Sequence, residues 1–166
     1  MHLTSLRHVL LILAVALGAQ ATQSLAAETA GEPKRVVFVC EHGSVKSLVA
    51  TVYFNRLAEQ RGLPYRAVAR GTAPDSTVPS PVAEGLHGDG FDVAGFVPRL
   101  LRASDIDGIA LIVSFDQDVT TTVGGRAPYR KWDDLPGVLT DYGRGRDAIV
   151  SHVDALLSAL AGGGSP

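Results

Sequence analysis

The arrangement of apolar and polar residues predicts strands and helices that alternate along the chain. Residues 35–40, Arg-Val-Val-Phe-Val-Cys, are short, β-branched and almost continuously apolar, which is typical of a parallel strand buried on both faces. Segments of helical spacing follow, and glycine and proline separate them from the next apolar segments. The expected strands are 35–40, 65–69 and 109–115, and the expected helices are 45–61, 82–88 and 144–160.

This alternation predicts an α/β fold, a three-layer, doubly wound parallel sheet of about four strands. Ligands of such sheets bind beyond the carboxyl ends of the strands, where the loop after the first strand enters a helix. We expect one domain over residues 35–160, with a flexible glycine-rich tail at 161–166.

The N-terminus has the features of an export signal. Arg7 and His8 precede an apolar run at 9–17, and small residues near Ala26 offer a cleavage site. Because the run is shorter than the ~20 residues that a spanning helix needs, we expect a cleaved signal peptide at 1–27 and a periplasmic destination. No stable membrane insertion is expected after cleavage, and an N-terminal anchor is the alternative. Residues 28–34 would form a linker.

Composition limits the classes of partner and cofactor. The net charge of −2 and pI near 6.2 give no broad basic surface, so we expect no nucleic-acid partner. His42, His87 and His152 are scattered and the chain has one cysteine, so neither a metal nor a cofactor is expected. That cysteine, Cys40, has no internal partner for a disulfide. It is an inert buried thiol, half of an intermolecular bridge, or a reactive group.

The position of Cys40 favours the reactive group. A loop that leads into a helix presents unpaired N–H groups and the positive end of the helix dipole, which bind tetrahedral anions and stabilise a thiolate. Lys46 adds a nearby cation, Gly43 can adopt positive φ, and Ser47 can hydrogen-bond the sulfur. The alternative is that Cys40 only packs at the end of a buried strand.

The loop from Cys40 to Ser47 resembles the C-x5-R-[ST] signature of low-molecular-weight protein tyrosine phosphatases and of the arsenate reductases that share their fold. The resemblance continues over residues 36 to 160. It includes Arg70-Gly71-Thr72, Gly90-Phe91-Asp92-Val93, the strand that ends at Asp116, and Trp132-Asp133-Asp134-Leu135-Pro136.

The resemblance implies a fold, a reaction and a set of roles. Cys40 would be the nucleophile that forms a phosphocysteine, Lys46 would take the place of the family's arginine, and Ser47 would assist the sulfur. Asp134 would be the general acid, with Asp133 as the alternative because Leu135 separates Asp134 from Pro136. The residues expected to bind the phosphoryl oxygens are Glu41, His42, Gly43, Ser44 and Val45.

Two departures from the family pattern leave the activity open. Arginine grips two phosphoryl oxygens with a planar fork, whereas Lys46 offers a point charge, so transition-state stabilisation should be weaker. Gly43 replaces the family's usual asparagine. His42 matches the arsenate reductase branch, although a surface-loop role is the simpler interpretation.

Three hypotheses follow for the function. The first is a phosphatase that acts on a phosphorylated protein, including phosphotyrosine, or on a small phosphate ester. The second is an arsenate reductase that uses an external thiol, since the chain has no resolving cysteine. The third is a catalytically weak oxyanion-binding domain.

Other side chains have two possible roles. Asp116 and Asp118 follow a predicted strand, where they either help to form the pocket or face solvent. Tyr129 and Trp132 either line the pocket for an aromatic substrate or pack in the core.

Overall fold

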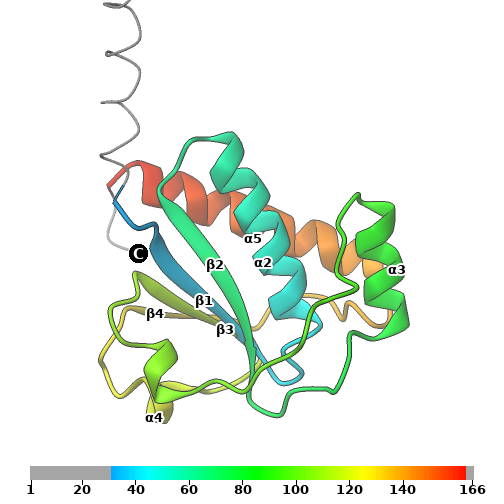
Figure 1. The fold of residues 1–166 in the computed structure, drawn as a ribbon, viewed down its shortest axis with the longest axis horizontal. Coiled ribbons are helices and arrows are strands. Elements are labelled where there is room, and N and C mark those ends of the chain that lie inside the picture. Colours follow the sequence, from blue (N-terminus) through cyan, green and yellow to red (C-terminus); the bar gives the residue numbers. More distant parts are fainter. Residues whose placement is uncertain (1–30, 164–166) are drawn as a thin grey trace, which may run out of the picture. The chain divides into compact units, whose positions relative to one another are not determined.

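The structure is a computed structural model that describes residues 31–163. A parallel sheet of four strands forms its centre (Figure 1). Its spatial order is β2-β1-β3-β4, and each neighbouring pair runs parallel. The predicted fold class is therefore confirmed. The strands are β1 (Lys34–Cys40), β2 (Tyr65–Gly71), β3 (Leu111–Phe115) and β4 (Tyr129–Trp132).

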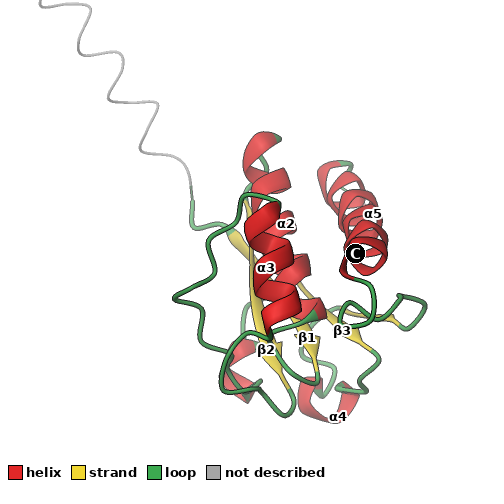
Figure 2. Ribbon diagram, turned by 90° about the vertical axis from the view of Figure 1, so that its right-hand side faces the viewer, coloured by secondary structure: helices red, strands yellow, loops and turns green. Residues whose placement is uncertain are grey.

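Helices cover the sheet on both faces, which makes three layers (Figures 1 and 2). One face packs against α2 (Lys46–Gln60), α3 (Ser80–Gly88) and α5 (Tyr142–Ala161), and their side chains share one buried cluster with β1 and β3. The other face is covered by a smaller cluster that includes Ile106 and Val123. Ile106 directly follows the short helix η1 (Ala103–Asp105), and Val123 belongs to α4 (Thr120–Val123).

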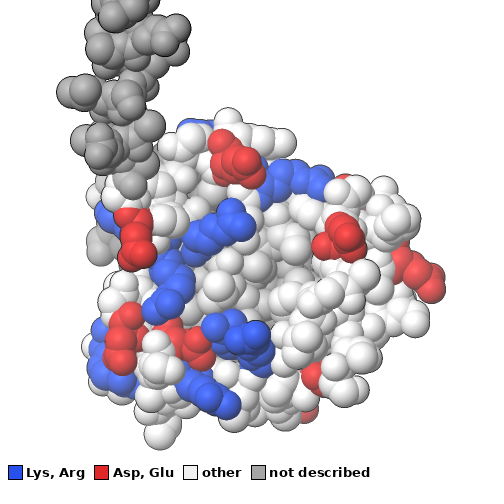
Figure 3. All heavy atoms as spheres, viewed as in Figure 1, with Lys and Arg blue, Asp and Glu red and all other residues white. Residues whose placement is uncertain are grey.

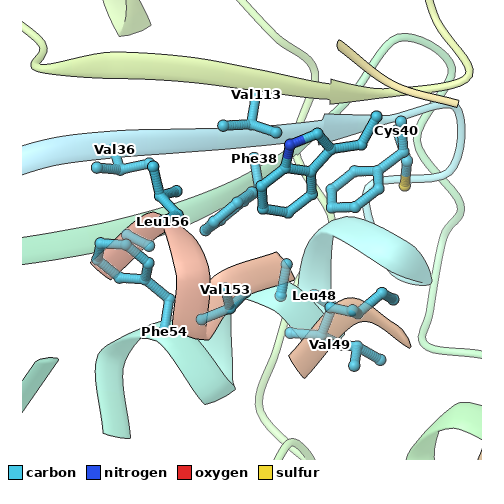
Figure 4. Close-up of a cluster of buried hydrophobic side chains, with 14 of the residues drawn as sticks. Val36, Phe38, Cys40, Leu48, Val49, Phe54, Val113, Val153 and Leu156 are labelled. Carbon is cyan, nitrogen blue, oxygen red and sulfur yellow. The ribbon is translucent and has the colours of Figure 1, made fainter. Parts of the chain in front are cut away.

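The central position of β1 follows from its side chains. Residues 36–39 are fully buried, and alternate side chains enter opposite layers, as the strand period requires. Phe38 is the centre of an aromatic group, with its ring centroid 5.6 Å from that of Phe54, 6.0 Å from that of Phe115 and 5.8 Å from that of Trp132. Figure 4 shows this cluster and the Cys40 side chain on the same side of β1. Trp132 therefore packs in the core.

Asp89, at the C-terminal end of α3, ties together the helices of one layer. Its Oδ2 accepts hydrogen bonds from Tyr53 Oη of α2 at 2.8 Å and Tyr142 Oη of α5 at 2.6 Å, and its Oδ1 accepts from Arg146 Nη1 at 2.8 Å. Although burial opposes the charged form, the hydrogen bonds from Tyr142 and Tyr53 and the charge of Arg146 lower the pKa of Asp89. Burial and the hydrogen bond to Asp89 raise the pKa of Tyr53 to about 12.

The predicted element types agree with the structure, with boundary shifts of up to two residues. Three elements were not predicted, namely η1, α4 and β4, because each has only three or four residues. The predicted signal peptide at 1–27 lies outside the described residues. Within residues 31–163, no helix is both long and apolar enough to cross a membrane.

We expect Asp89→Asn to lower the free energy of unfolding by about 2 kcal/mol at pH 7, because it removes a carboxylate that accepts three hydrogen bonds. The folded-state pKa of Asp89 is depressed, so its contribution is present above the unfolded pKa and is lost as pH falls through the folded pKa. Urea denaturation at pH 7 and pH 3 measures both effects. The control is Glu84→Gln, which makes the same chemical change at an exposed position of α3. An equal loss in both variants would contradict this role.

Candidate functional site

Cys40 is the last residue of β1, and its sulfur is held by the loop that follows. The Gly43 N–H donates to Cys40 Sγ at 3.2 Å, and Ser47 Oγ lies 3.1 Å from the same atom. Ser47 belongs to the first turn of α2 and is fully buried. The loop and the first turn of α2 therefore place two hydrogen-bonding groups beside the sulfur of a buried thiol.

The N-terminus of α2 makes no side-chain cap. Val45 precedes the helix with φ −110° and ψ −105°, and it gives no side-chain hydrogen bond to the backbone N–H groups of the first turn. Such N–H groups, with the helix dipole behind them, are a binding site for a tetrahedral anion. The helix N-terminus thus has the geometry that the predicted anion-binding role requires.

Gly43 and Gly71 hold the loop against the end of β2. Gly43 has φ +67°, and a Cβ built there would lie 2.8 Å from the Gly71 nitrogen. A Cβ at Gly71 would lie 2.8 Å from the Glu41 carbonyl oxygen. These two glycines therefore allow a backbone contact that larger residues would force apart.

The residues after β2 continue this contact as a ladder. Thr72 N–H donates to the Cys40 carbonyl at 3.0 Å, Ala73 N–H to the Glu41 carbonyl at 2.9 Å, and Asp75 N–H to the His42 carbonyl at 3.0 Å. The loop is thus fixed by backbone hydrogen bonds on one side and by α2 on the other.

Asp75 orients two side chains of the loop. Its Oδ2 accepts a hydrogen bond from Ser44 Oγ at 2.6 Å, and its Oδ1 lies 3.1 Å from His42 Nδ1. Sequence reasoning missed Asp75, because it is more than 30 residues from its partners and its glycine- and proline-rich segment carries no pattern that points to them. His42 is therefore a loop residue whose ring is held by a carboxylate.

Lys46 is anchored by residues of the segments that follow β3 and β4. Its Nζ donates to Asp116 Oδ2 at 2.5 Å and to the Leu135 carbonyl at 3.1 Å. Asp116 has φ +58°, a left-handed conformation that aspartate tolerates better than most residues. The positive charge of Lys46 is thus paired with a carboxylate in this conformation.

A cavity of about 310 Å³ opens beside these groups. Of the two aspartates expected near the end of the third strand, Asp116 lines it, whereas Asp118 Oδ1 accepts hydrogen bonds from the N–H and Oγ1 of Thr120. The cavity has an apolar wall that includes Val138 and Leu139. The lining residues are Cys40, Glu41, His42, Val45, Lys46, Phe115, Asp116, Gln117, Gly137, Val138, Leu139 and Thr140.

Asp134 lies outside the cavity lining. Its side chain is 74% exposed, and its Oδ1 is 3.4 Å from His152 Nε2 on α5. Asp133, the alternative, pairs with Lys131 at 2.9 Å and is also absent from the lining. The acid role of Asp134 therefore stays a prediction that requires its segment to change conformation.

Neither aromatic side chain considered for the pocket contributes to its wall. Tyr129 Oη lies 2.8 Å from Ser114 Oγ and packs with the smaller cluster, and Trp132 is buried in the larger one. Among residues 31–163, no group of three or more histidine, cysteine, aspartate or glutamate side chains is arranged to hold a metal ion.

Comparison with solved structures shows the same fold. YfkJ from Bacillus subtilis has a TM-score of 0.68 at 20% identity over 79% of this chain and 96% of its own. A low-molecular-weight protein tyrosine phosphatase from T. tengcongensis has a TM-score of 0.62 at 21% identity over 75% of this chain and 98% of its own. A thioredoxin-dependent arsenate reductase from Corynebacterium glutamicum has a TM-score of 0.61 at 19% identity over 90% of this chain and 73% of its own.

A comparison with curated protein sequences found no match. The family model described as low molecular weight phosphotyrosine protein phosphatase matches residues 35–131, which is more than half of the chain. The matched region contains the Cys40 loop and Asp116 but ends before Asp134. The chain therefore belongs to the low-molecular-weight phosphotyrosine protein phosphatase family, whose fold is shared by arsenate reductases and whose members bind phosphate groups and related oxyanions.

Proposed function

We propose that this protein is a cysteine-dependent phosphatase that hydrolyses phosphate monoesters, including phosphotyrosine. The observation that carries the proposal is the environment of Cys40 Sγ, which has the Gly43 N–H at 3.2 Å and Ser47 Oγ at 3.1 Å beside an uncapped helix N-terminus. Donors to sulfur and unpaired N–H groups favour both the thiolate and a bound phosphoryl group. Export of the mature chain, as residues 1–27 predict, would make its substrates periplasmic.

The proposed reaction has two steps: the first consumes the Cys40 thiolate and the second restores it. The Cys40 thiolate attacks phosphorus, so that an S–P bond forms as the bond to the ester oxygen breaks and that oxygen takes up a proton. Water then attacks phosphorus, the S–P bond breaks, and inorganic phosphate leaves with the thiolate restored. Ser47, as a hydrogen-bond donor to the sulfur, stabilises the thiolate as it departs.

The cysteine count favours hydrolysis over arsenate reduction. Reduction of an arsenate adduct on Cys40 requires a second thiol to take the sulfur into a disulfide, and this chain holds one cysteine. Hydrolysis of a phosphocysteine requires only water. Arsenate reduction with an external thiol is therefore the second candidate, and thiol-dependent arsenite formation is its assay.

Cys40→Ser should abolish phosphate release from para-nitrophenyl phosphate, with a loss of about 10³-fold or more, because the hydroxyl is a much weaker nucleophile. Inorganic phosphate should still bind to the variant, as measured by calorimetry, because the backbone donors remain. Undiminished turnover in Cys40→Ser would contradict the proposal.

Lys46→Arg should raise kcat by about tenfold or more, because a guanidinium can grip two oxygens of the transferring phosphoryl group. The matched control is Lys131→Arg, which makes the same change on β4 outside the cavity. Equal rates for both variants would show that Lys46 does not act on the transferring group.

Asp116→Asn should tighten phosphate binding by roughly threefold to tenfold at low salt, because the Lys46 ammonium would lose its carboxylate partner. Asparagine tolerates the left-handed backbone that this position requires, so the variant changes mainly the charge. Asp118→Asn is the control, and the difference should shrink in 0.5 M NaCl. Unchanged affinity would show that the ion pair does not limit anion binding.

The source of the leaving-group proton is tested by a series of aryl phosphates of decreasing leaving-group acidity. Because Asp134 can supply the proton only if its segment closes on the cavity, we expect a shallow slope in the wild type that steepens in Asp134→Asn but not in Asp133→Asn. A steep wild-type slope that Asp134→Asn leaves unchanged would show that Asp134 stays outside the cavity during turnover.

A further inference from the structure

A second cavity lies beside β2, the edge strand of the sheet, at the end nearest the Cys40 loop. It measures about 510 Å³ and is lined by Arg70, Pro98, Arg99, Leu100, Arg102, Ser104 and Asp105. Figure 3 shows lysine and arginine side chains gathered along the face over β2. This basic surface contrasts with the chain's net charge of −2. We call the cavity the arginine pocket.

One of the three arginines is already neutralised. Arg70 Nε and Nη2 donate to Asp105 Oδ1 at 2.9 and 2.7 Å, and Asp105 Oδ2 accepts from the Arg102 backbone N–H at 2.9 Å. Burial opposes the charged form of Asp105, but the hydrogen bonds from Arg70 and from the Arg102 backbone lower its pKa. Asp105 therefore keeps its negative charge. The guanidinium groups of Arg99 and Arg102 have no carboxylate partner in the described part of the chain. The pocket therefore has a surplus of positive charge.

The sheet edge beside the pocket is closed to an added strand. Gly71 N–H donates to the Arg99 carbonyl, and Leu101 N–H donates to the Gly71 carbonyl, each at 2.8 Å. Further along the edge, the Asn55 side chain bonds both the N–H and the carbonyl of Ala67, at 2.7 and 3.1 Å. A partner must therefore bind here mainly through side chains rather than by strand addition.

The pocket is within reach of a ligand held at Cys40. Gly71 pairs with Cys40 in the β1–β2 register and forms a bridge with Leu100 on its other side. With neighbouring strands ~4.8 Å apart, the backbone at Leu100 is roughly 10 Å from that at Cys40. An extended peptide covers this distance in about three residues.

Exposed apolar side chains border both cavities. Leu100, which lines the arginine pocket, is 48% exposed, and Val97, which lies next to the lining residue Pro98, is 62% exposed. Leu139, also 48% exposed, lines the Cys40 cavity. Unpaired guanidinium groups beside apolar side chains suit a polypeptide that carries both carboxylates and apolar residues.

We infer that the arginine pocket is a docking site for an acidic segment of the phosphorylated protein substrate, with Arg99 and Arg102 pairing with carboxylates about three residues from the phosphorylated residue. The inference rests on the proposed function for the ligand at Cys40, but the binding itself does not require turnover. It makes the substrate a phosphoprotein with an acidic flank rather than a small phosphate ester.

The test uses two phosphotyrosine peptides. One carries glutamates that begin three residues before the phosphotyrosine, and the other carries glutamates that begin three residues after it. Matched peptides carry glutamine in place of glutamate. Of the two acidic peptides, the one whose glutamates reach the pocket should lose about tenfold in kcat/KM in the double variant Arg99→Gln/Arg102→Gln. The rates on the glutamine peptides and on para-nitrophenyl phosphate should be unchanged. The control Arg61→Gln/Arg126→Gln removes the same charge at two arginines outside the pocket. Equal losses in both double variants would overturn the inference.

Binding is measured separately in a Cys40→Ser background by fluorescence anisotropy with labelled phosphorylated and unphosphorylated acidic peptides. We expect the pocket variant to weaken both by about tenfold and 0.5 M NaCl to remove most of the difference. If the wild type has no turnover, the proposed function fails and this measurement still decides the docking site. Equally tight binding of a labelled single-stranded oligonucleotide would overturn the inference, because the pocket would then be a general polyanion site.

Discussion

The close approach of two backbones at Gly43 and Gly71 is the constraint on which the site depends. It brings the loop after β1 against the end of β2, where the N–H groups of residues 72, 73 and 75 bond three successive loop carbonyls. With one side of the loop occupied in this way, the Gly43 N–H is left to meet the Cys40 sulfur. The Cys40 sulfur is therefore positioned mainly by backbone, and a side chain at either glycine would separate the segments.

The charge of Lys46 in the Cys40 cavity is paired with that of Asp116, so the cavity holds an ion pair rather than a lone cation. The sequence resemblance aligns Lys46 with the family's arginine, and its ammonium is shared between Asp116 and the Leu135 carbonyl. A guanidinium has five donors and could satisfy a carboxylate while still presenting N–H groups to a phosphoryl oxygen, whereas an ammonium has three. An oxyanion bound at this site would therefore depend more on loop N–H groups than it would in an arginine-containing loop.

The sequence predicted the elements whose burial is uniform and left out those whose surroundings decide them. β1 and β3 are apolar on both faces, so their patterns were unambiguous, and α2 and α5 are long enough for helical spacing to be clear. β4 has four residues, and Arg130 and Lys131 lie within it, because an edge strand tolerates charge that a central strand does not. Its identity as a strand comes from pairing with β3.

The same division holds at the site. The loop from Cys40 to Ser47 is contiguous, so the sequence alone determined the place of the cysteine at the end of a strand, the helix that follows and the glycine with positive φ. Only the tertiary structure decided which carboxylates meet the loop: Asp75 and Asp116 do, whereas Asp134 is turned toward His152. The physical reason is that local spacing fixes the direction of side chains within one strand, loop or helix, but contacts between distant segments depend on how the layers pack.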